Sequence, residues 1–180
     1  MLDPAIGYLI VASIALLLVS AGTHKLRGLA RFTEIFAAYR VLPDAFARRL
    51  AWLVPCLELS VAASLLWGPS RRFGVVSAVA ILIGYASALS INLLRGRRDL
   101  DCGCGRARDR RAIAPWMVWR NLSLAAALGV AMLPWSPRAT NLTDFLTLLG
   151  GLLAGMALYV AIDRLLGDVA PKAMILGSTS

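Results

Sequence analysis

Two cysteines that lie one residue apart are the side chains best suited to chemistry in this sequence. Cys102 and Cys104 occur in the stretch LDCGCGRARDRR, with Gly103 between them and Gly105 after them. A disulfide between such close neighbours would close a very small ring, and a strained disulfide is reduced more easily than a relaxed one. The glycines supply the backbone freedom that this ring requires. The pattern therefore predicts a redox-active pair of thiols.

The charges around the two cysteines favour the same chemistry. Positive charge stabilises the thiolate, which is the form that attacks a disulfide. Four arginines follow the pair: Arg106, Arg108, Arg110 and Arg111. Asp99 and Asp101 precede it and act in the opposite direction. Two alternatives remain open: backbone N–H groups of the glycine-rich turn that hold a phosphate, or two cysteines without any role.

A metal site is not expected from these residues. A structural zinc ion takes four ligands, and an iron–sulfur cluster is usually held by four cysteines. The chain has only three cysteines and one histidine. The third cysteine, Cys56, follows Pro55, which can locally open a helix. Cys56 could therefore exchange with Cys102 or Cys104 if their loop folds back, and burial as a small apolar residue is the alternative.

Two ionisable residues interrupt otherwise uncharged segments. Glu58 lies in residues 50–68 and Arg120 in residues 113–134. An ionisable residue within a membrane span is a candidate functional group whose partner should be sought. At a rise of about 1.5 Å per residue, both lie roughly 10–12 Å from the same membrane face. We therefore expect a Glu58–Arg120 ion pair, which serves either packing or proton transfer. Three polar residues near segment ends are expected to be interfacial anchors: His24, Lys25 and Asn92.

The segments that must position these residues are long and apolar. Of the 180 residues, 59% are hydrophobic and 16% are charged, whereas soluble domains have about 25% charged residues. Five runs of about 20 residues, enough to cross a bilayer as helices, carry almost no charge. They are residues 5–22, 50–68, 73–94, 113–134 and 145–162. The sequence predicts an all-α, polytopic membrane helical bundle with about five transmembrane helices. It forms a single membrane domain, 1–166, followed by a flexible tail, 167–180.

The distribution of positive charge predicts the orientation. The formal net charge is +9, and most of the 19 lysines and arginines fall on one side of the predicted spans. Only Arg71, Arg72 and Arg138 fall on the other side. Because cytoplasmic loops are enriched in Lys and Arg, the N-terminus is expected outside the inner (plasma) membrane and the C-terminus in the cytoplasm. The basic residues then contact anionic lipid, and a nucleic-acid partner is not expected.

A short amphipathic helix is expected between the first two spans. Apolar residues recur there every three or four positions: Leu26, Leu29, Phe32, Phe36 and Tyr39. Arg27, Arg31 and Arg40 lie between them, which is typical of a helix in the membrane interface. Pro43–Asp44 should end this helix, with Asp44 as the N-cap of the next one.

Four stretches resemble the MauE family of methylamine-utilisation membrane proteins, which belongs to the wider DoxX-like group. They are SAGTHKL, AYRVLP, VPCLEL and DCGCG, and the resemblance covers roughly residues 5–165. It implies a redox-associated protein built on a DoxX-like four-helix core plus one span. Such proteins are linked to disulfide formation in exported proteins alongside thioredoxin-like partners, the namesake client being the small subunit of methylamine dehydrogenase. Cys102, Gly103 and Cys104 would form the redox motif, and Glu58 would be the intramembrane acid.

The leading hypothesis is a thiol–disulfide oxidoreductase or electron carrier that exchanges with a thioredoxin-like or exported partner. The alternatives are a non-catalytic membrane subunit or assembly factor and, less well matched, a small transporter that uses Glu58 and Arg120. The orientation places the dithiol at the cytoplasmic face, where thiols are normally kept reduced. Electron transfer would therefore need a protein partner, a lipid-soluble quinone or a path through the bundle.

Overall fold

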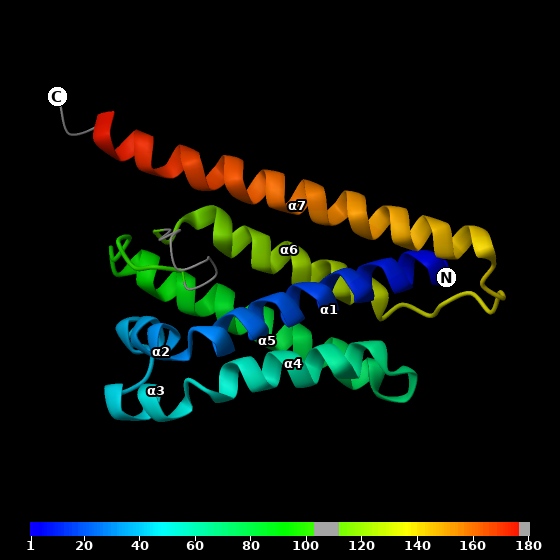
Figure 1. The fold of residues 1–180 in the computed structure, drawn as a ribbon, viewed down its shortest axis with the longest axis horizontal. Helices are drawn as coiled ribbons and strands as arrows, with labels where there is room; N and C mark the ends of the chain where they lie inside the picture. Colours follow the sequence, from blue (N-terminus) through cyan, green and yellow to red (C-terminus); the bar gives the residue numbers. More distant parts are fainter. Residues whose placement is uncertain (103–111, 177–180) are drawn as a thin grey trace.

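The chain is all-helical over residues 1–102 and 112–176, which are the residues that this computed structural model describes (Figure 1). In chain order the helices are α1 (Pro4–Arg27), α2 (Leu29–Ala38), α3 (Asp44–Leu50), α4 (Leu53–Leu66), the short 3-10 helix η1 (Gly68–Ser70), α5 (Arg71–Leu94), α6 (Pro115–Ala131) and α7 (Leu142–Leu176). The predicted all-α class is confirmed.

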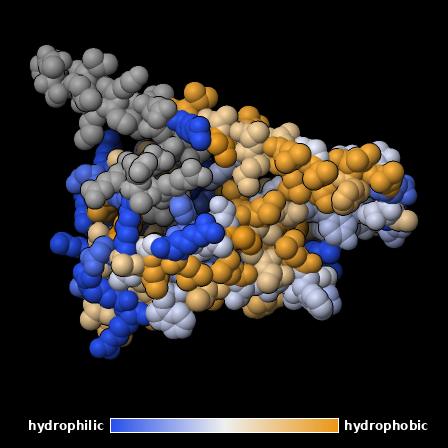
Figure 2. All heavy atoms as spheres, viewed as in Figure 1, coloured by the Kyte–Doolittle hydropathy of each residue, from blue (hydrophilic) through white to orange (hydrophobic). Residues whose placement is uncertain are grey.

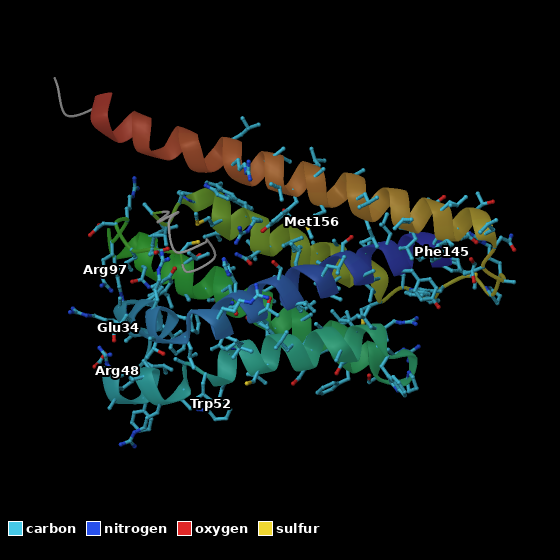
Figure 3. All side chains as sticks on the ribbon, viewed as in Figure 1. Glu34, Arg48, Trp52, Arg97, Phe145 and Met156 are labelled. Carbon is cyan, nitrogen blue, oxygen red and sulfur yellow. The ribbon has the colours of Figure 1, made fainter. Side chains whose placement is uncertain are left out.

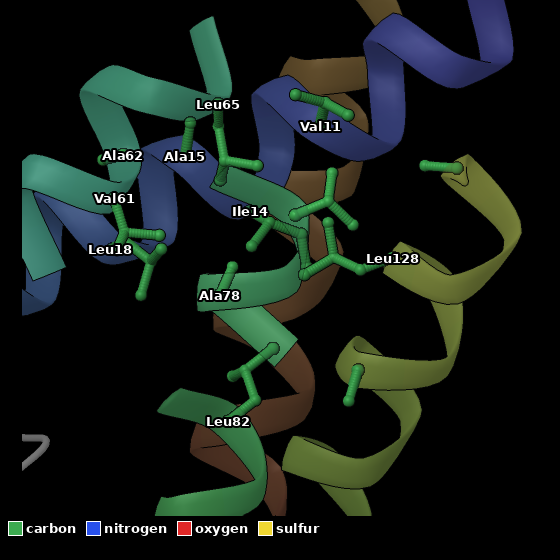
Figure 4. Close-up of a cluster of buried hydrophobic side chains, with 13 residues drawn as sticks. Val11, Ile14, Ala15, Leu18, Val61, Ala62, Leu65, Ala78, Leu82 and Leu128 are labelled. Carbon is green, nitrogen blue, oxygen red and sulfur yellow. The ribbon is translucent and has the colours of Figure 1, made fainter. Parts of the chain in front are cut away.

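Four of the helices enclose the hydrophobic core (Figure 4). α1, α4, α5 and α6 each present apolar residues to it at the three- and four-residue spacing of one helical face. The buried side chains include Ile14 and Leu18 of α1, Leu65 of α4, Leu82 of α5 and Leu128 of α6. α7 lies outside this core along α1, where a Cβ added at Gly151 would come within 3.0 Å of the Leu9 side chain.

Several helices are long and apolar enough to cross a membrane. Three of them qualify individually, namely Pro4–Arg27, Gly68–Leu94 and Leu142–Ile162. α3 and α4 together make a fourth candidate if their 41° bend is part of one span. α6 has only 17 residues and is not among these candidates. The polytopic membrane class is therefore supported with three to four candidate spans, while the count of five remains a prediction.

The bend between α3 and α4 follows from Pro55. Proline has no N–H to donate, and its ring clashes with the carbonyl four residues earlier, which belongs to Ala51. α3 ends at Leu50 and α4 begins at Leu53, so the break falls at this carbonyl. The separate helix α3 was not predicted. The predicted role of Asp44 was also wrong, because Pro43 is the N-cap and Asp44 instead accepts a hydrogen bond from Nε of Arg48 at 3.0 Å.

The predicted amphipathic helix is present as α2, although it is shorter than expected. α1 continues to Arg27 and the chain breaks at Gly28. α2 buries Phe32 and Ala37, and its exposed Glu34 pairs with Arg48 of α3 at 2.5 Å (Figure 3). The ion pair joins the two short helices. Their position in the membrane interface remains a prediction.

The polypeptide brings two sets of loops to opposite ends of the bundle (Figure 1). We call the end with the N-terminus, η1 and residues 132–141 the N-terminal end. We call the end with α2, α3 and residues 95–102 and 112–114 the amphipathic end. Hydrophilic atoms gather at the amphipathic end, while hydrophobic atoms cover the middle of the bundle (Figure 2). α7 is helical to Leu176, beyond the predicted end of its span at 162, and the flexibility of residues 167–180 remains a prediction.

Contacts of Arg138 and of the backbone connect the helices at the N-terminal end. Arg138 donates to Asp3 at 2.9 Å and to Asp144 at 2.7 Å, which joins the start of α1 to the start of α7. The hydrogen bond from Arg138 to Asp3, together with one from the Ala5 backbone N–H, lowers the pKa of the Asp3 carboxyl below 3.8. The Leu2 N–H donates to the Pro134 carbonyl at 2.8 Å, so the chain before α1 is also tied to the α6–α7 connection.

Candidate functional site

The segment that carries the dithiol begins with a defined helix end. α5 stops at Leu94, and Gly96 follows with φ 73°, a conformation that favours glycine. The N–H of Arg97 donates to the Asn92 carbonyl at 3.0 Å, and the N–H of Gly96 donates to the Leu93 carbonyl at 3.0 Å. These two bonds form a Schellman motif, which ends a helix and redirects the chain. Asn92 is fully buried and donates to the Ala88 carbonyl at 3.0 Å, so its predicted role as an interfacial anchor was wrong.

Paired backbone and side-chain contacts then fix the base of the dithiol loop. The N–H of Ile113 donates to the Leu100 carbonyl at 3.0 Å, and Asp101 forms an isolated bridge with Ala112. The Asp101 carboxylate is held by Arg31 of α2 at 2.5 Å. The charge before the cysteines is therefore compensated from another helix, which spacing along the chain did not indicate.

Cys102 lies at this base with a half-buried side chain. It packs against a small apolar cluster of Leu89, Ile113 and Met117, which come from α5, the loop and α6. Gly103 and Cys104 lie outside the described residues, as do the four arginines that follow. The pairing of Cys102 with Cys104 therefore remains a prediction.

A buried group of charges lies between α1, α4 and α5. Glu58 is 0% exposed and pairs through Oε1 with the ammonium of Lys25, which is 7% exposed. The hydroxyl of Tyr85 donates to the same carboxylate oxygen at 2.5 Å and accepts from Lys25 Nζ at 3.0 Å. The ammonium also lies 5.4 Å from the centre of the Phe32 ring. We call these four residues the Lys25 cluster.

The partner of Glu58 differs from the one we predicted. The ion pair is made with Lys25 and not with Arg120, and Lys25 is a buried residue rather than an interfacial anchor. The reason is the close approach of α1 and α4. A Cβ added at Gly22 would lie 3.0 Å from Cγ of Leu59 and 3.2 Å from the Pro55 carbonyl oxygen. Without a side chain at Gly22, the last turn of α1 comes close enough for Lys25 to reach Glu58.

Arg120 and Cys56 have different surroundings. Arg120 is half-buried on α6, with its guanidinium 5.5 Å from the centre of the Trp116 ring. Its neighbour Asn121 is buried and donates to the Met117 carbonyl at 2.8 Å. Cys56 is half-buried on α4, and within the described part of the chain it forms no disulfide. His24, in contrast to Lys25, is exposed.

A cavity of about 310 Å³ connects the Lys25 cluster with Cys102. Its walls are mostly apolar and include the aromatic rings of Phe32, Phe36 and Tyr39. The polar side chains in its lining are few: Lys25, Tyr39, Tyr85, Cys102, Arg120 and Asn121. Cys56 is not part of the lining. The cavity therefore combines the features of a small-molecule site, a largely apolar volume with a small number of converging polar groups.

The described residues offer no metal centre. Nowhere in residues 1–102 and 112–176 do three side chains of His, Cys, Asp or Glu come together as a group that could hold a metal ion. The chemistry available to the described site is therefore that of a thiol, a buried ammonium–carboxylate pair and a tyrosine hydroxyl around an apolar cavity.

Fold and site together define a helical membrane protein with a cysteine at the edge of a mainly apolar cavity and a buried charge cluster opposite. The family model described as methylamine utilisation protein MauE matches residues 3–135, and the chain belongs to this family. The match extends from the start of α1 through α6 and ends before α7.

Curated relatives agree with this assignment. The chain is 37% identical to the methylamine utilization protein MauE of Paracoccus denitrificans, over 93% of this chain and 90% of that protein. It is 35% identical to the protein of the same name from Paracoccus versutus, over 88% of this chain and 84% of the relative. The corresponding protein of Methylophilus methylotrophus is 32% identical over 94% and 90% of the two chains. No solved structure matches this chain.

Proposed function

We propose that this chain serves methylamine utilisation through thiol–disulfide exchange at Cys102 and Cys104. The observation that carries the proposal is the position of Cys102, which is held at the base of its loop and lines a cavity. Arg120 places a positive charge at the same cavity. A cation near a thiol favours the reactive thiolate. The exchange partner is a thioredoxin-like protein or an exported protein that needs its disulfides made or maintained.

The exchange proceeds through a mixed disulfide. A thiolate of the partner attacks the Cys102–Cys104 disulfide, and one cysteine of the pair leaves as a thiolate. The second thiolate of the partner then attacks the mixed disulfide. The products are a partner disulfide and a Cys102–Cys104 dithiol, so two electrons have moved from the partner to this chain. The reduction potentials of the two pairs set the direction.

The proposed topology follows from the distribution of charge over the fold. With α6 as a fifth span, the chain crosses the inner membrane five times. The N-terminus is then outside and the C-terminus in the cytoplasm. The amphipathic end carries Arg31, Arg40, Arg48, Arg95 and Arg97 among its basic residues, whereas the N-terminal end carries Arg71, Arg72 and Arg138. This asymmetry supports a cytoplasmic amphipathic end in contact with anionic lipid.

Trapping the mixed disulfide tests the exchange. Cys102→Ser and Cys104→Ser are each expressed as the full chain in native membranes, and adducts are resolved on non-reducing gels. We expect one of the two variants to accumulate a reducible adduct. Its remaining thiol forms a mixed disulfide with the partner, and the second cysteine that would resolve this disulfide is missing. Cys56→Ser is the matched control and should behave as the unchanged protein. If neither variant forms an adduct and the double variant retains full methylamine-dependent growth, the exchange proposal is wrong and a non-catalytic role of this chain is supported.

A further inference from the structure

We propose that the cavity beside Cys102 binds the head group of a lipid-soluble quinone, which accepts the electrons of the dithiol. The redox step rests on the proposed function, whereas binding rests on the cavity alone. The electron-donating thiol and the groups that would bind the acceptor line one cavity, since Cys102, Lys25 and Tyr85 all belong to its walls. A membrane-soluble acceptor also removes the need for a second dithiol at the N-terminal end of the bundle.

The size and walls of the cavity suit a flat, mainly apolar ring. Ligand sites begin at about 300 Å³, and this cavity measures about 310 Å³. Phe32, Phe36 and Tyr39 of the α2 region form one wall. Gly84 of α5 also lines the cavity, and a Cβ added there would have nothing within 4 Å. The ring of a quinone can therefore lie against aromatic side chains with free space over α5.

The Lys25 ammonium in the cavity wall lacks one hydrogen-bond acceptor among the described residues, and a quinone carbonyl oxygen could supply it. The Lys25 ammonium has three N–H donors, and Glu58 and Tyr85 accept two of them. No third acceptor lies within hydrogen-bond distance in the described part of the chain, although Lys25 is only 7% exposed and lines the cavity. A buried donor without an acceptor is unfavourable. A carbonyl oxygen of the quinone ring completes the set.

The charge of the cluster favours a neutral ligand over an anionic lipid head group. Glu58 already balances the positive charge of Lys25 through a direct ion pair. A phosphate would place a second negative charge beside the buried carboxylate, whose Oε2 makes no hydrogen bond with the described residues. A quinone brings carbonyl acceptors without net charge. The cluster therefore selects for hydrogen-bond acceptors rather than for anions.

The redox step balances with the groups named. Cys102 and Cys104 lose two electrons and two protons as their S–H bonds break and one S–S bond forms. The quinone gains both electrons and both protons, and its two C=O groups become C–OH groups of a hydroquinone. Lys25 and Tyr85 stabilise the negative charge that develops on the carbonyl oxygen as it is reduced. No further oxidant is required.

Titration of the full-length protein in detergent with a short-chain ubiquinone, followed by tryptophan fluorescence, tests the binding. Gly84→Leu fills the cavity, while Gly129→Leu on α6 is the matched control because Gly129 also has nothing within 4 Å and lies outside the lining. We expect Gly84→Leu to weaken binding about tenfold or more by occupying the site, with Gly129→Leu unchanged. Tyr85→Phe, which removes one hydrogen-bonding group, should weaken binding about fivefold.

Anaerobic mixing of the reduced protein with the same quinone tests the redox step. One hydroquinone should form for each pair of maleimide-reactive thiols lost. The Cys102→Ser/Cys104→Ser protein should not reduce the quinone. Equal binding by Gly84→Leu and Gly129→Leu would mean that the quinone partitions only into detergent, and the inference would fall. A protein that exchanges disulfides with its partner yet never reduces the quinone would also overturn it, while the proposed function would stand. Quinone reduction without any protein exchange would instead support the cavity and overturn the proposed partner.

Discussion

Both ends of the bundle carry exposed ion pairs, and the amphipathic end also buries one. At the N-terminal end, Arg138 is 38% exposed and donates hydrogen bonds to Asp3 and Asp144 at 2.7–2.9 Å. At the amphipathic end, Lys25 and Glu58 are buried beside a cavity, and one carboxylate oxygen makes no hydrogen bond within the described residues. Burial of an ion pair rarely improves stability over an apolar pair. The N-terminal end therefore fastens helices, whereas the amphipathic end accepts a stability cost, as functional sites do.

Removal of one member of the buried pair should have the largest effect on the free energy of unfolding. Lys25→Ala leaves the Glu58 carboxylate in an apolar core without its cation, and we expect a loss of about 3–5 kcal/mol in the free energy of unfolding. The double change Lys25→Met/Glu58→Leu should recover most of it, because no charge is then buried. Denaturation in detergent measures both.

A matched change at an exposed pair supplies the control. Arg48→Ala removes the partner of Glu34, and both side chains are largely exposed, at 46% and 65%. Exposed pairs contribute little to stability, so the loss should be much smaller than that for Lys25→Ala. A cost for Arg48→Ala equal to that for Lys25→Ala would contradict the distinction between buried and exposed charge.

Two glycines of α5 differ in how closely other atoms pack against them. A Cβ at Gly74, near the N-terminal end, would lie 2.7 Å from the Leu65 backbone nitrogen, so Gly74→Ala should destabilise by about 1–3 kcal/mol. A Cβ at Gly84, beside the cavity, meets nothing within 4 Å, so Gly84→Ala should stabilise by about 0.5–1 kcal/mol through higher helix propensity. Thermal unfolding of the two variants should shift in opposite directions. Destabilisation by both substitutions would contradict the free space beside Gly84.

The smallest expected effect is on how the melting temperature depends on pH in acid. Because Arg138 and the Ala5 N–H lower the pKa of folded Asp3, its stabilising contribution is present above the unfolded value near 3.8 and is lost as the pH falls through the lower folded value. Asp3→Asn keeps an N-cap but has no charge to titrate. The melting temperature of this variant should therefore fall less steeply than that of the unchanged protein below pH 4. Identical slopes would mean that Asp3 does not contribute.

The sequence predicted those features that depend on neighbouring residues. The apolar runs became helices, and the three- to four-residue spacing around Phe32 and Phe36 became α2. Glu58 was recognised as unusual because it interrupts an apolar run. Its partner was not recognised, since depth in the membrane does not reveal which helices touch. Gly22, whose missing side chain brings α1 against α4, is the signal that could have indicated Lys25.

The cavity could not be predicted for the same reason. Its lining is drawn from α1, the α2 region, α4, α5, α6 and the loop that holds Cys102, and no spacing along the chain encodes that meeting. The pairing of Asp101 with Arg31 likewise joins residues far apart in sequence. The dithiol motif itself was evident from the sequence, because two of the three cysteines lie one residue apart and each is followed by a glycine.

Labelling of Cys102 in native membranes tests whether Cys102 and Cys104 form a reversible disulfide. In a Cys56→Ser background, maleimide should modify Cys102 only after treatment with a reductant, because Cys104 protects it as a disulfide in the oxidised protein. With Cys104→Ser added, labelling should no longer depend on the reductant. Cys102 that reacts equally with and without reductant while Cys104 is present, or that never reacts, would contradict a redox pair at this site.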